Sequence, residues 1–148
     1  MSRRAPTPGR PRPDRAVLAA IEFLLLDVDG VLTDGRLWFG ADGESLKSFN
    51  VRDGHGIKSL VAAGIAVAVI SGRRSAAVTA RMRELGVADV AQGVADKARV
   101  LAELLKRNAV DARRVACLVD DTPDLDLMAA VGLPAAVADA HPDVIAAA

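Results

Sequence analysis

Short apolar runs alternate along the chain with segments of helical spacing. The apolar runs cover residues 23–26, 65–70, 115–119 and 133–137, and residues 89–91 suggest one further short strand. Short apolar runs that end in turn-forming or acidic residues predict strands buried on both faces. The segments of helical spacing cover residues 57–63, 75–85, 97–106 and 122–131. This alternation predicts an α/β, Rossmann-like domain in which helices cover both faces of a parallel sheet.

The segment between the first strand and the first helix has a different pattern. Residues 36–39 and 46–49 are short runs with aromatic residues, and they flank a turn-rich centre. This pattern predicts a β-hairpin, which holds Trp38, Phe39 and Phe49 in a chain with one Trp and three Phe. An isolated hairpin is marginal in water, so it could join the core, cover a site as a flap or pair with another subunit.

Polar side chains follow the predicted strands where each strand ends. Asp27 and Asp29 come directly after the first strand, and Ser71 follows the second. Because the carboxyl ends of parallel strands meet at one edge of the sheet, we expect these groups to converge on one crevice. Taken alone, each is also typical of an ordinary turn or helix start. The complete set is Asp27, Asp29, Ser71, Lys97, Asp120, Asp121 and Asp124.

The residue types indicate phosphate chemistry with a metal ion. Several carboxylates in one cleft repel one another and favour a hard cation such as Mg²⁺. A lysine and a hydroxyl among acids suit a phosphate, which needs cationic and hydrogen-bonding partners. A carboxylate can attack phosphorus to form an aspartyl phosphate, and a second acid can protonate the leaving oxygen and then activate water.

The same motifs resemble those of a known superfamily. Residues 27–35 (DVDGVLTDG) resemble the first motif of the haloacid dehalogenase superfamily, residues 70–73 the second, Lys97 the third and residues 120–124 the fourth. Three further runs resemble a family of phosphatases that act on 3-deoxy-D-manno-octulosonate 8-phosphate. These runs are residues 34–40, 49–57 and 131–142, and the resemblance extends over roughly residues 17–145.

This resemblance implies a role for each matching residue. Asp27 would be the nucleophile, and Asp29 the general acid and base that also offers its backbone carbonyl to Mg²⁺. Asp120 would be the third protein contact of the metal. Asp124 and Asp121 would contact the metal only indirectly, through its ligands or its bound water. The phosphoryl group would be held by Ser71, Lys97 and the backbones of Gly30 and Gly72. A sugar acid also needs a cation for its carboxylate, which Arg73 or Arg52 could supply.

The implied function is Mg²⁺-dependent hydrolysis of the eight-carbon sugar acid phosphate to the free acid and phosphate, within lipopolysaccharide precursor synthesis. A phosphatase of a nine-carbon, sialic-type sugar acid phosphate is an alternative with the same chemistry. A catalytically weakened tetrameric assembly module is another. A phosphoacceptor receiver domain also uses strand-end aspartates with Lys and Mg²⁺, but receivers lack the run at residues 27–35 and the hairpin.

The resemblance further implies a fold without a large cap domain, and a homotetramer in which the hairpin takes part. Two departures from the family pattern affect these expectations. Val119 stands where the family has Gly, and a Cβ at this strand exit is expected to shift Asp120. The family also continues into a glycine-rich tail, whereas this sequence ends at residues 146–148, so we expect a domain without that tail.

Charge is unevenly distributed along the 148 residues. Residues 1–15 carry five Arg and one Asp, which leaves 14 basic and 18 acidic residues elsewhere, a net charge of −4. Because residues 1–16 are rich in Arg and Pro, we expect a disordered basic arm before a single domain at residues 17–148. A mildly acidic domain argues against nucleic acid as the main partner.

The single cysteine and the hydropathy pattern indicate where in the cell the protein is located. The one cysteine, Cys117, lies in an apolar run and is expected to be a core residue. No run approaches the ~18 apolar residues of a membrane span, and the Arg- and Pro-rich start lacks the apolar block of a secretory signal. We therefore expect a cytoplasmic protein without a membrane partner.

Overall fold

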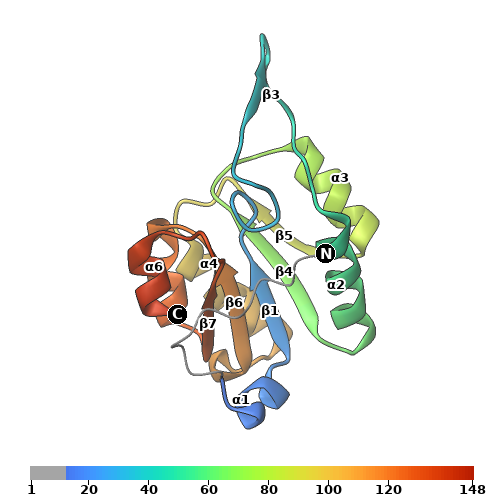
Figure 1. Cartoon of the computed structure of the whole chain (residues 1–148). Helices are drawn as coiled ribbons and strands as arrows, with labels where there is room; N and C mark the ends of the chain where they lie inside the picture. Colours follow the sequence, from blue (N-terminus) through green and yellow to red (C-terminus); the bar gives the residue numbers. More distant parts are fainter. Residues whose placement is uncertain (1–12) are drawn as a thin grey trace, which may run out of the picture.

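A five-stranded parallel sheet forms the centre of the molecule in a computed structural model that describes residues 13–148 (Figure 1). The strand order is β5-β4-β1-β6-β7. The strands are β1 (Phe23–Leu26), β4 (Ala66–Ser71), β5 (Asp89–Gln92), β6 (Val115–Val119) and β7 (Leu133–Ala136). All neighbouring pairs are parallel, so the carboxyl ends of the strands lie along one edge. The predicted α/β parallel sheet is confirmed.

Helices cover both faces of the sheet, as predicted. The helices are α1 (Arg15–Ala20), α2 (Val51–Ala62), α3 (Ala76–Leu85), α4 (Lys97–Asn108), α5 (Leu125–Ala129) and α6 (Pro142–Ala147), with short 3-10 helices η1 (Ala112–Arg114) and η2 (Thr122–Asp124). Side chains of α2 and α3 belong to one buried cluster, and those of α4, α5 and α6 to the other. The sheet is therefore the middle of three layers, with α2 and α3 on one side of it (Figure 1).

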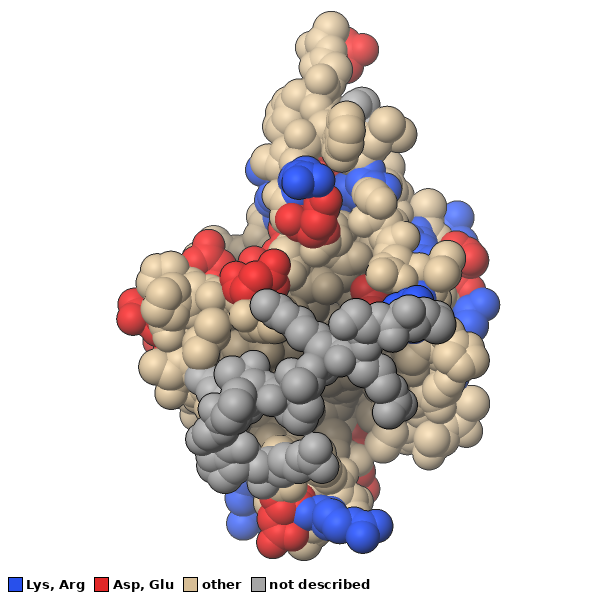
Figure 2. All heavy atoms as spheres, in the orientation of Figure 1, with Lys and Arg blue, Asp and Glu red and all other residues tan. Residues whose placement is uncertain are grey.

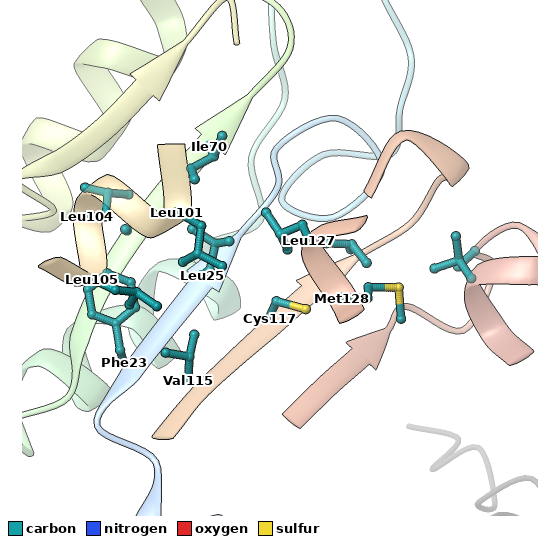
Figure 3. Packing of buried hydrophobic residues seen from close by; sticks show 14 residues of the cluster. Phe23, Leu25, Ile70, Leu101, Leu104, Leu105, Val115, Cys117, Leu127 and Met128 are labelled. Carbon is teal, nitrogen blue, oxygen red and sulfur yellow. The ribbon is translucent and has the colours of Figure 1, made fainter. Parts of the chain in front are cut away.

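Alternation along β1 explains how one strand serves two cores. Phe23 and Leu25 belong to the cluster under α4, whereas Leu26 belongs to the cluster under α2 and α3. Successive side chains of a strand point to opposite faces, so a wholly apolar run buries both. Figure 3 shows Leu101 and Leu105 of α4 beside Phe23 and Leu25. The central position of β1 fixes the place where the chain emerges at Asp27.

Two helices differ from the sequence prediction at their ends. Helix α2 begins at Val51 rather than at residue 57, because the Asn50 side chain accepts a hydrogen bond from the Arg52 N–H and caps the helix. Its first turn is largely exposed, so apolar spacing did not reveal it. The helix predicted at residues 122–131 is instead the 3-10 helix η2 followed by α5. Asp121, not Thr122, caps η2 by accepting from the N–H of Thr122.

The predicted hairpin is present as the antiparallel pair β2 (Trp38–Gly40) and β3 (Gly43–Leu46). It projects beyond the carboxyl edge of the sheet (Figure 1). Trp38 is 55% exposed, Phe39 63% and Leu46 64%, so the hairpin is not part of the core. Figure 2 shows that its outer part carries few Lys, Arg, Asp or Glu side chains. Between β1 and α2 the chain thus places a hairpin rather than a cap domain.

Most of the predicted basic arm, residues 1–12, lies outside the described residues. At its end, Arg15 and Ala16 already belong to α1, whose first turn is capped by the Asp14 side chain through the Ala16 N–H at 3.0 Å. Helix α1 thus begins two residues before the expected boundary at residue 17. None of the helices in residues 13–148 is long and apolar enough to span a membrane.

Candidate active site

A tight turn after β1 sets the directions of Asp27 and Asp29. The backbone N–H groups of Val31, Leu32 and Thr33 all lie within 3.2 Å of the Val28 carbonyl, which accepts from each of them. Val28 itself is fully buried, so the turn is anchored in the core. Asp27 and Asp29, on either side of Val28, are thereby held at the carboxyl edge of the sheet, and both line the same cavity.

Gly30 allows this turn to approach Asp120 closely. Its φ is +89°, a left-handed conformation that favours glycine. A Cβ at this position would lie 1.9 Å from Asp120 Oδ2, which is far inside van der Waals contact. The carboxylate at the end of β6 therefore packs against the backbone of the turn that follows β1.

Lys97 joins two of the carboxylates. It is the first residue of α4, which the Asp96 side chain caps by accepting from the Arg99 N–H. Its ammonium lies 2.8 Å from Asp27 Oδ1 and 2.6 Å from Asp124 Oδ1. Burial opposes the charge, but the carboxylates of Asp27 and Asp124 outweigh it and raise the pKa of Lys97. The ammonium is therefore a fixed positive charge inside the site.

Three carboxylates crowd into one small volume. Oxygens of Asp27, Asp120 and Asp124 all lie within 4.8 Å of one another. Burial, followed by the charges of Asp27 and Asp124, raises the pKa of Asp120 to about 7. Burial also raises the pKa of Asp124, although Lys97 partly offsets that effect. One ammonium does not balance three carboxylates, so the group carries unbalanced negative charge when all three are ionised.

This arrangement suits a hard divalent cation. Asp124 is 2% exposed, and its Oδ1 has no partner in hydrogen-bond geometry in the part of the chain that is described. Lys97 lies 2.6 Å from that oxygen, so its ammonium offsets part of the negative charge. Oxygen donors with excess negative charge are the ligands that Mg²⁺ prefers. The donor set thus fits the predicted metal.

The end of β4 supplies hydrogen-bonding groups to the opposite wall. Ser71 is 2% exposed, and its hydroxyl accepts from the Arg73 N–H at 3.3 Å. Gly72 follows it and also lines the cavity, whose volume is about 340 Å³. The cavity brings together nearly all of the predicted residues, namely Asp27, Asp29, Ser71, Gly72, Arg73, Lys97, Asp120, Asp121 and Asp124.

The hairpin also reaches the site, through charged residues that were not among the predicted site residues. The Lys47 ammonium donates to Asp29 Oδ1 and lies 3.2 Å from Glu44 Oε2. The Arg73 guanidinium lies 3.3 Å from Glu44 and 5.9 Å above the centre of the Phe39 ring. Burial opposes ionisation of Glu44, but hydrogen bonds with Ser75 and Lys47 lower its pKa overall. The charged residues Glu44, in β3, and Lys47, directly after it, were the available signal.

Some residues that the sequence analysis singled out lie away from the carboxylate group at the centre of the site. Arg52 lies exposed in the first turn of α2 and does not line the cavity that holds Asp27. Asp121 is exposed at the rim, where it caps η2. Val119 is 1% exposed and packs in the core under α4 and α5. With Val119 in place, Asp120 lies within 4.8 Å of Asp27 and Asp124.

The chain is similar in sequence to known phosphatases. No family model matches the chain. The chain is 46% identical over 125 residues to the 3-deoxy-D-manno-octulosonate 8-phosphate phosphatase KdsC of Salmonella typhi. That match covers 84% of this chain and 66% of the relative, so the chain spans slightly less than two thirds of the length of the curated protein.

Solved structures agree with this match. The cobalt-bound deoxy-D-mannose-octulosonate 8-phosphate phosphatase of Haemophilus influenzae superposes with a TM-score of 0.87 at 46% identity, over 88% of this chain and 77% of that one. The Moraxella catarrhalis 3-deoxy-D-manno-octulosonate 8-phosphate phosphatase, in complex with magnesium, phosphate and KDO, superposes with a TM-score of 0.84 at 34% identity. That match covers 87% of this chain and 74% of the other. The chain therefore belongs to the 3-deoxy-D-manno-octulosonate 8-phosphate phosphatase family of the haloacid dehalogenase superfamily.

Proposed function

We propose that this protein is a Mg²⁺-dependent phosphomonoesterase that hydrolyses 3-deoxy-D-manno-octulosonate 8-phosphate to the free sugar acid and phosphate, within lipopolysaccharide precursor synthesis. One observation carries the proposal. Asp27, at the end of the central strand, contacts the Lys97 ammonium, and its carboxylate lies within 4.8 Å of those of Asp120 and Asp124. A carboxylate beside a cation-binding group and a fixed ammonium suits attack on a phosphate ester.

Asp27 and Asp29 divide the chemistry. A carboxylate oxygen of Asp27 bonds to phosphorus while the ester P–O bond breaks, and Asp29 gives a proton to the leaving sugar oxygen. Water then attacks phosphorus, Asp29 takes a proton from that water, and the bond between Asp27 and phosphorus breaks. Asp27 is 8% exposed, so few water molecules compete with the substrate around the nucleophile.

The metal would be held by the carboxylates of Asp27 and Asp120 and by the backbone carbonyl of Asp29, with Asp124 and Asp121 beside them. A bound Mg²⁺ would neutralise charge on the transferring phosphoryl group and reduce its repulsion by the carboxylates. The Moraxella catarrhalis relative, in complex with magnesium, supports magnesium as the metal. Asp124, buried beside Asp27 and Asp120, supports a cation at this position as well.

The phosphoryl oxygens would contact Ser71, Lys97 and the backbones of Gly30 and Gly72. Arg73 is the better of the two candidates for the sugar carboxylate, because its guanidinium lines the cavity and its side chain is 43% exposed. An Arg fork matches the geometry of a carboxylate. Arg52 lies outside the cavity lining, so within this chain it has weaker support.

We also propose a homotetramer and a cytoplasmic location. Trp38, Phe39 and Leu46 form an exposed apolar surface on the hairpin, and such surfaces commonly mark protein interfaces. The thiol of Cys117 is buried and free, with a pKa raised to about 11 by burial, which suits a reducing compartment. The same hairpin would then both assemble subunits and border the active site.

The first prediction concerns the substrate. With Mg²⁺, we expect the highest kcat/KM on 3-deoxy-D-manno-octulosonate 8-phosphate, a lower value on a nine-carbon sialic-type acid phosphate, and the lowest on a neutral sugar phosphate. Asp27→Asn should abolish phosphate release on all three, a loss of roughly 10⁴-fold or more. Steady-state phosphate release measures each.

Two variants control this experiment. Asp42→Asn, in the exposed hairpin turn, should retain wild-type turnover. Arg73→Met should raise KM for the two acids and leave the neutral sugar phosphate nearly unaffected. A preference for the nine-carbon substrate would replace the proposed substrate. Wild-type protein without Mg²⁺-dependent turnover on any of them would instead support the assembly module.

The second prediction concerns pH and metal affinity. Because the pKa of Asp120 is raised to about 7, its carboxyl holds a proton below that pH in the metal-free protein. Mg²⁺ must displace this proton, so its dissociation constant should rise by up to about tenfold per pH unit below 7. Titration calorimetry from about pH 8 to about pH 6 measures both affinity and proton release.

The same shift also affects metal-free stability. Folding raises the pKa of Asp120 from 3.8 to about 7, so the folded state binds this proton more tightly than the unfolded state. The contribution of Asp120 to the free energy of unfolding should therefore decrease as the pH rises through that window. Asp120→Asn should bind Mg²⁺ more weakly, and it should lose the pH dependence that Asp120 gives to Mg²⁺ affinity and to metal-free stability. A pH-independent affinity in the wild-type protein would contradict the assignment of Asp120.

The third prediction concerns assembly. Light scattering should give a mass of about four times the 15.4 kDa subunit. The double change Trp38→Ser and Leu46→Ser should lower that mass, because it removes apolar surface from the hairpin. Leu18→Ser, at an exposed position of α1, is the matched control and should leave the mass unchanged. A monomer across the accessible concentration range would refute the tetramer.

A further inference from the structure

An ion-pair network joins the hairpin to the active site through a lysine that has no part in the reaction as described so far. Its central group is Lys47, whose side chain is 1% exposed. The ammonium donates to Asp29 Oδ1 and lies 3.2 Å from Glu44 Oε2. Lysine side chains are almost never buried to this extent unless they are paired. This lysine has two carboxylate partners, one on the hairpin and one in the active site.

The two oxygens of Asp29 have different surroundings. Oδ1 accepts the hydrogen bond of Lys47. Oδ2 lies 3.9 Å from Arg73 Nε, which is too long for a hydrogen bond. A carboxyl group exchanges a proton with a substrate through an oxygen that is free to approach it. The contact with Lys47 therefore leaves Oδ2 as the oxygen available for proton transfer.

Glu44 fixes Lys47 from the other side. Its carboxylate also receives Arg73 Nη2 at 3.3 Å, so it links the hairpin to the loop after β4. Glu44 belongs to β3 and Lys47 follows the end of that strand, whereas Asp29 belongs to the turn after β1. The buried ammonium of Lys47 thus joins Glu44 of the hairpin to Asp29.

We propose that Lys47 is a positioning residue, which holds Asp29 so that Oδ2 delivers the proton to the leaving sugar oxygen. This rests on the proposed function, because it takes Asp29 as the proton donor. As the P–O bond breaks, the proton moves from Asp29 Oδ2 to the bridging oxygen, and Lys47 keeps its own protons. Lys47 acts through Asp29 and not on the phosphoryl group.

The test compares two leaving groups on the same sugar. One substrate is 3-deoxy-D-manno-octulosonate 8-phosphate, and the other is its analogue with sulfur bridging carbon and phosphorus. A thiolate leaves without a proton, so phosphoryl transfer from the analogue does not need the acid. Lys47→Met keeps the aliphatic stem and removes the ammonium. It should lower kcat/KM for the oxygen ester by roughly 10- to 100-fold, and for the sulfur analogue by less than about threefold.

Further variants separate this role from a structural one. Lys106→Met, at an exposed position in the last turn of α4, should match the wild-type protein on both substrates. Lys47→Gln keeps a hydrogen-bond donor and should show a smaller loss that is again confined to the oxygen ester. Thermal unfolding establishes that each variant is folded.

The possible outcomes distinguish this proposal from the proposed function. An equal loss on both substrates, no loss on either, or failure of both Lys47 variants to fold would overturn the positioning role while leaving wild-type activity intact. Wild-type protein that hydrolyses neither compound in the presence of Mg²⁺ would overturn the proposed function, and the positioning role with it. A loss confined to the oxygen ester supports both.

Discussion

The contact of one ammonium with two buried carboxylates holds this site together. Lys97 lies within 3 Å of both Asp27 and Asp124, and Asp120 lies close to the same two acids. Three carboxylates at such distances repel one another, and this repulsion adds to burial in raising the pKa of Asp120 to about 7. Removing a partner from a buried charge pair is strongly destabilising, because it leaves an uncompensated charge. The rest of the fold supplies the rigid elements that keep these groups near one another.

Most of the fold and much of the site could be predicted from the sequence, because both follow from local patterns. The apolar run before Asp27 predicts a buried strand, and parallel strands bring their ends to one edge. That rule placed Ser71 and Lys97 beside Asp27 although they are far apart in the chain. Helix ends were harder to predict, because Asn50 and Asp121 cap helices through side-chain hydrogen bonds, which apolar spacing does not reveal.

The contacts of Lys47 with Asp29 and Glu44 could not be predicted in the same way. Lys47 pairs with Asp29 across 18 positions, and that pairing depends on how the hairpin leans over the site. No periodicity encodes such an angle. Val119 illustrates the opposite case, in which sequence comparison suggested a disturbance. The structure absorbs the side chain in the core, where it is 1% exposed, so its Cβ does not separate Asp120 from Asp27.

Two sets of hairpin residues therefore have distinct roles. Trp38 and Leu46, which face one another in the β2–β3 pair, are exposed, whereas Glu44 and Lys47 contact each other and residues of the active site. An interface formed by Trp38 and Leu46 would restrict the motion of the hairpin, and with it the orientation of Asp29. Assembly and proton transfer would then depend on the same short segment.

The assignment of Asp27 as the nucleophile is tested most directly by a crystal structure with Mg²⁺ and beryllofluoride, which mimics a phosphoryl group on a carboxylate. Beryllium should be bonded to a carboxylate oxygen of Asp27, with the Ser71 hydroxyl and the Lys97 ammonium in contact with the fluorides. Beryllofluoride bonded to a different residue, or absent from Asp27 under conditions in which the enzyme turns over, would contradict the account.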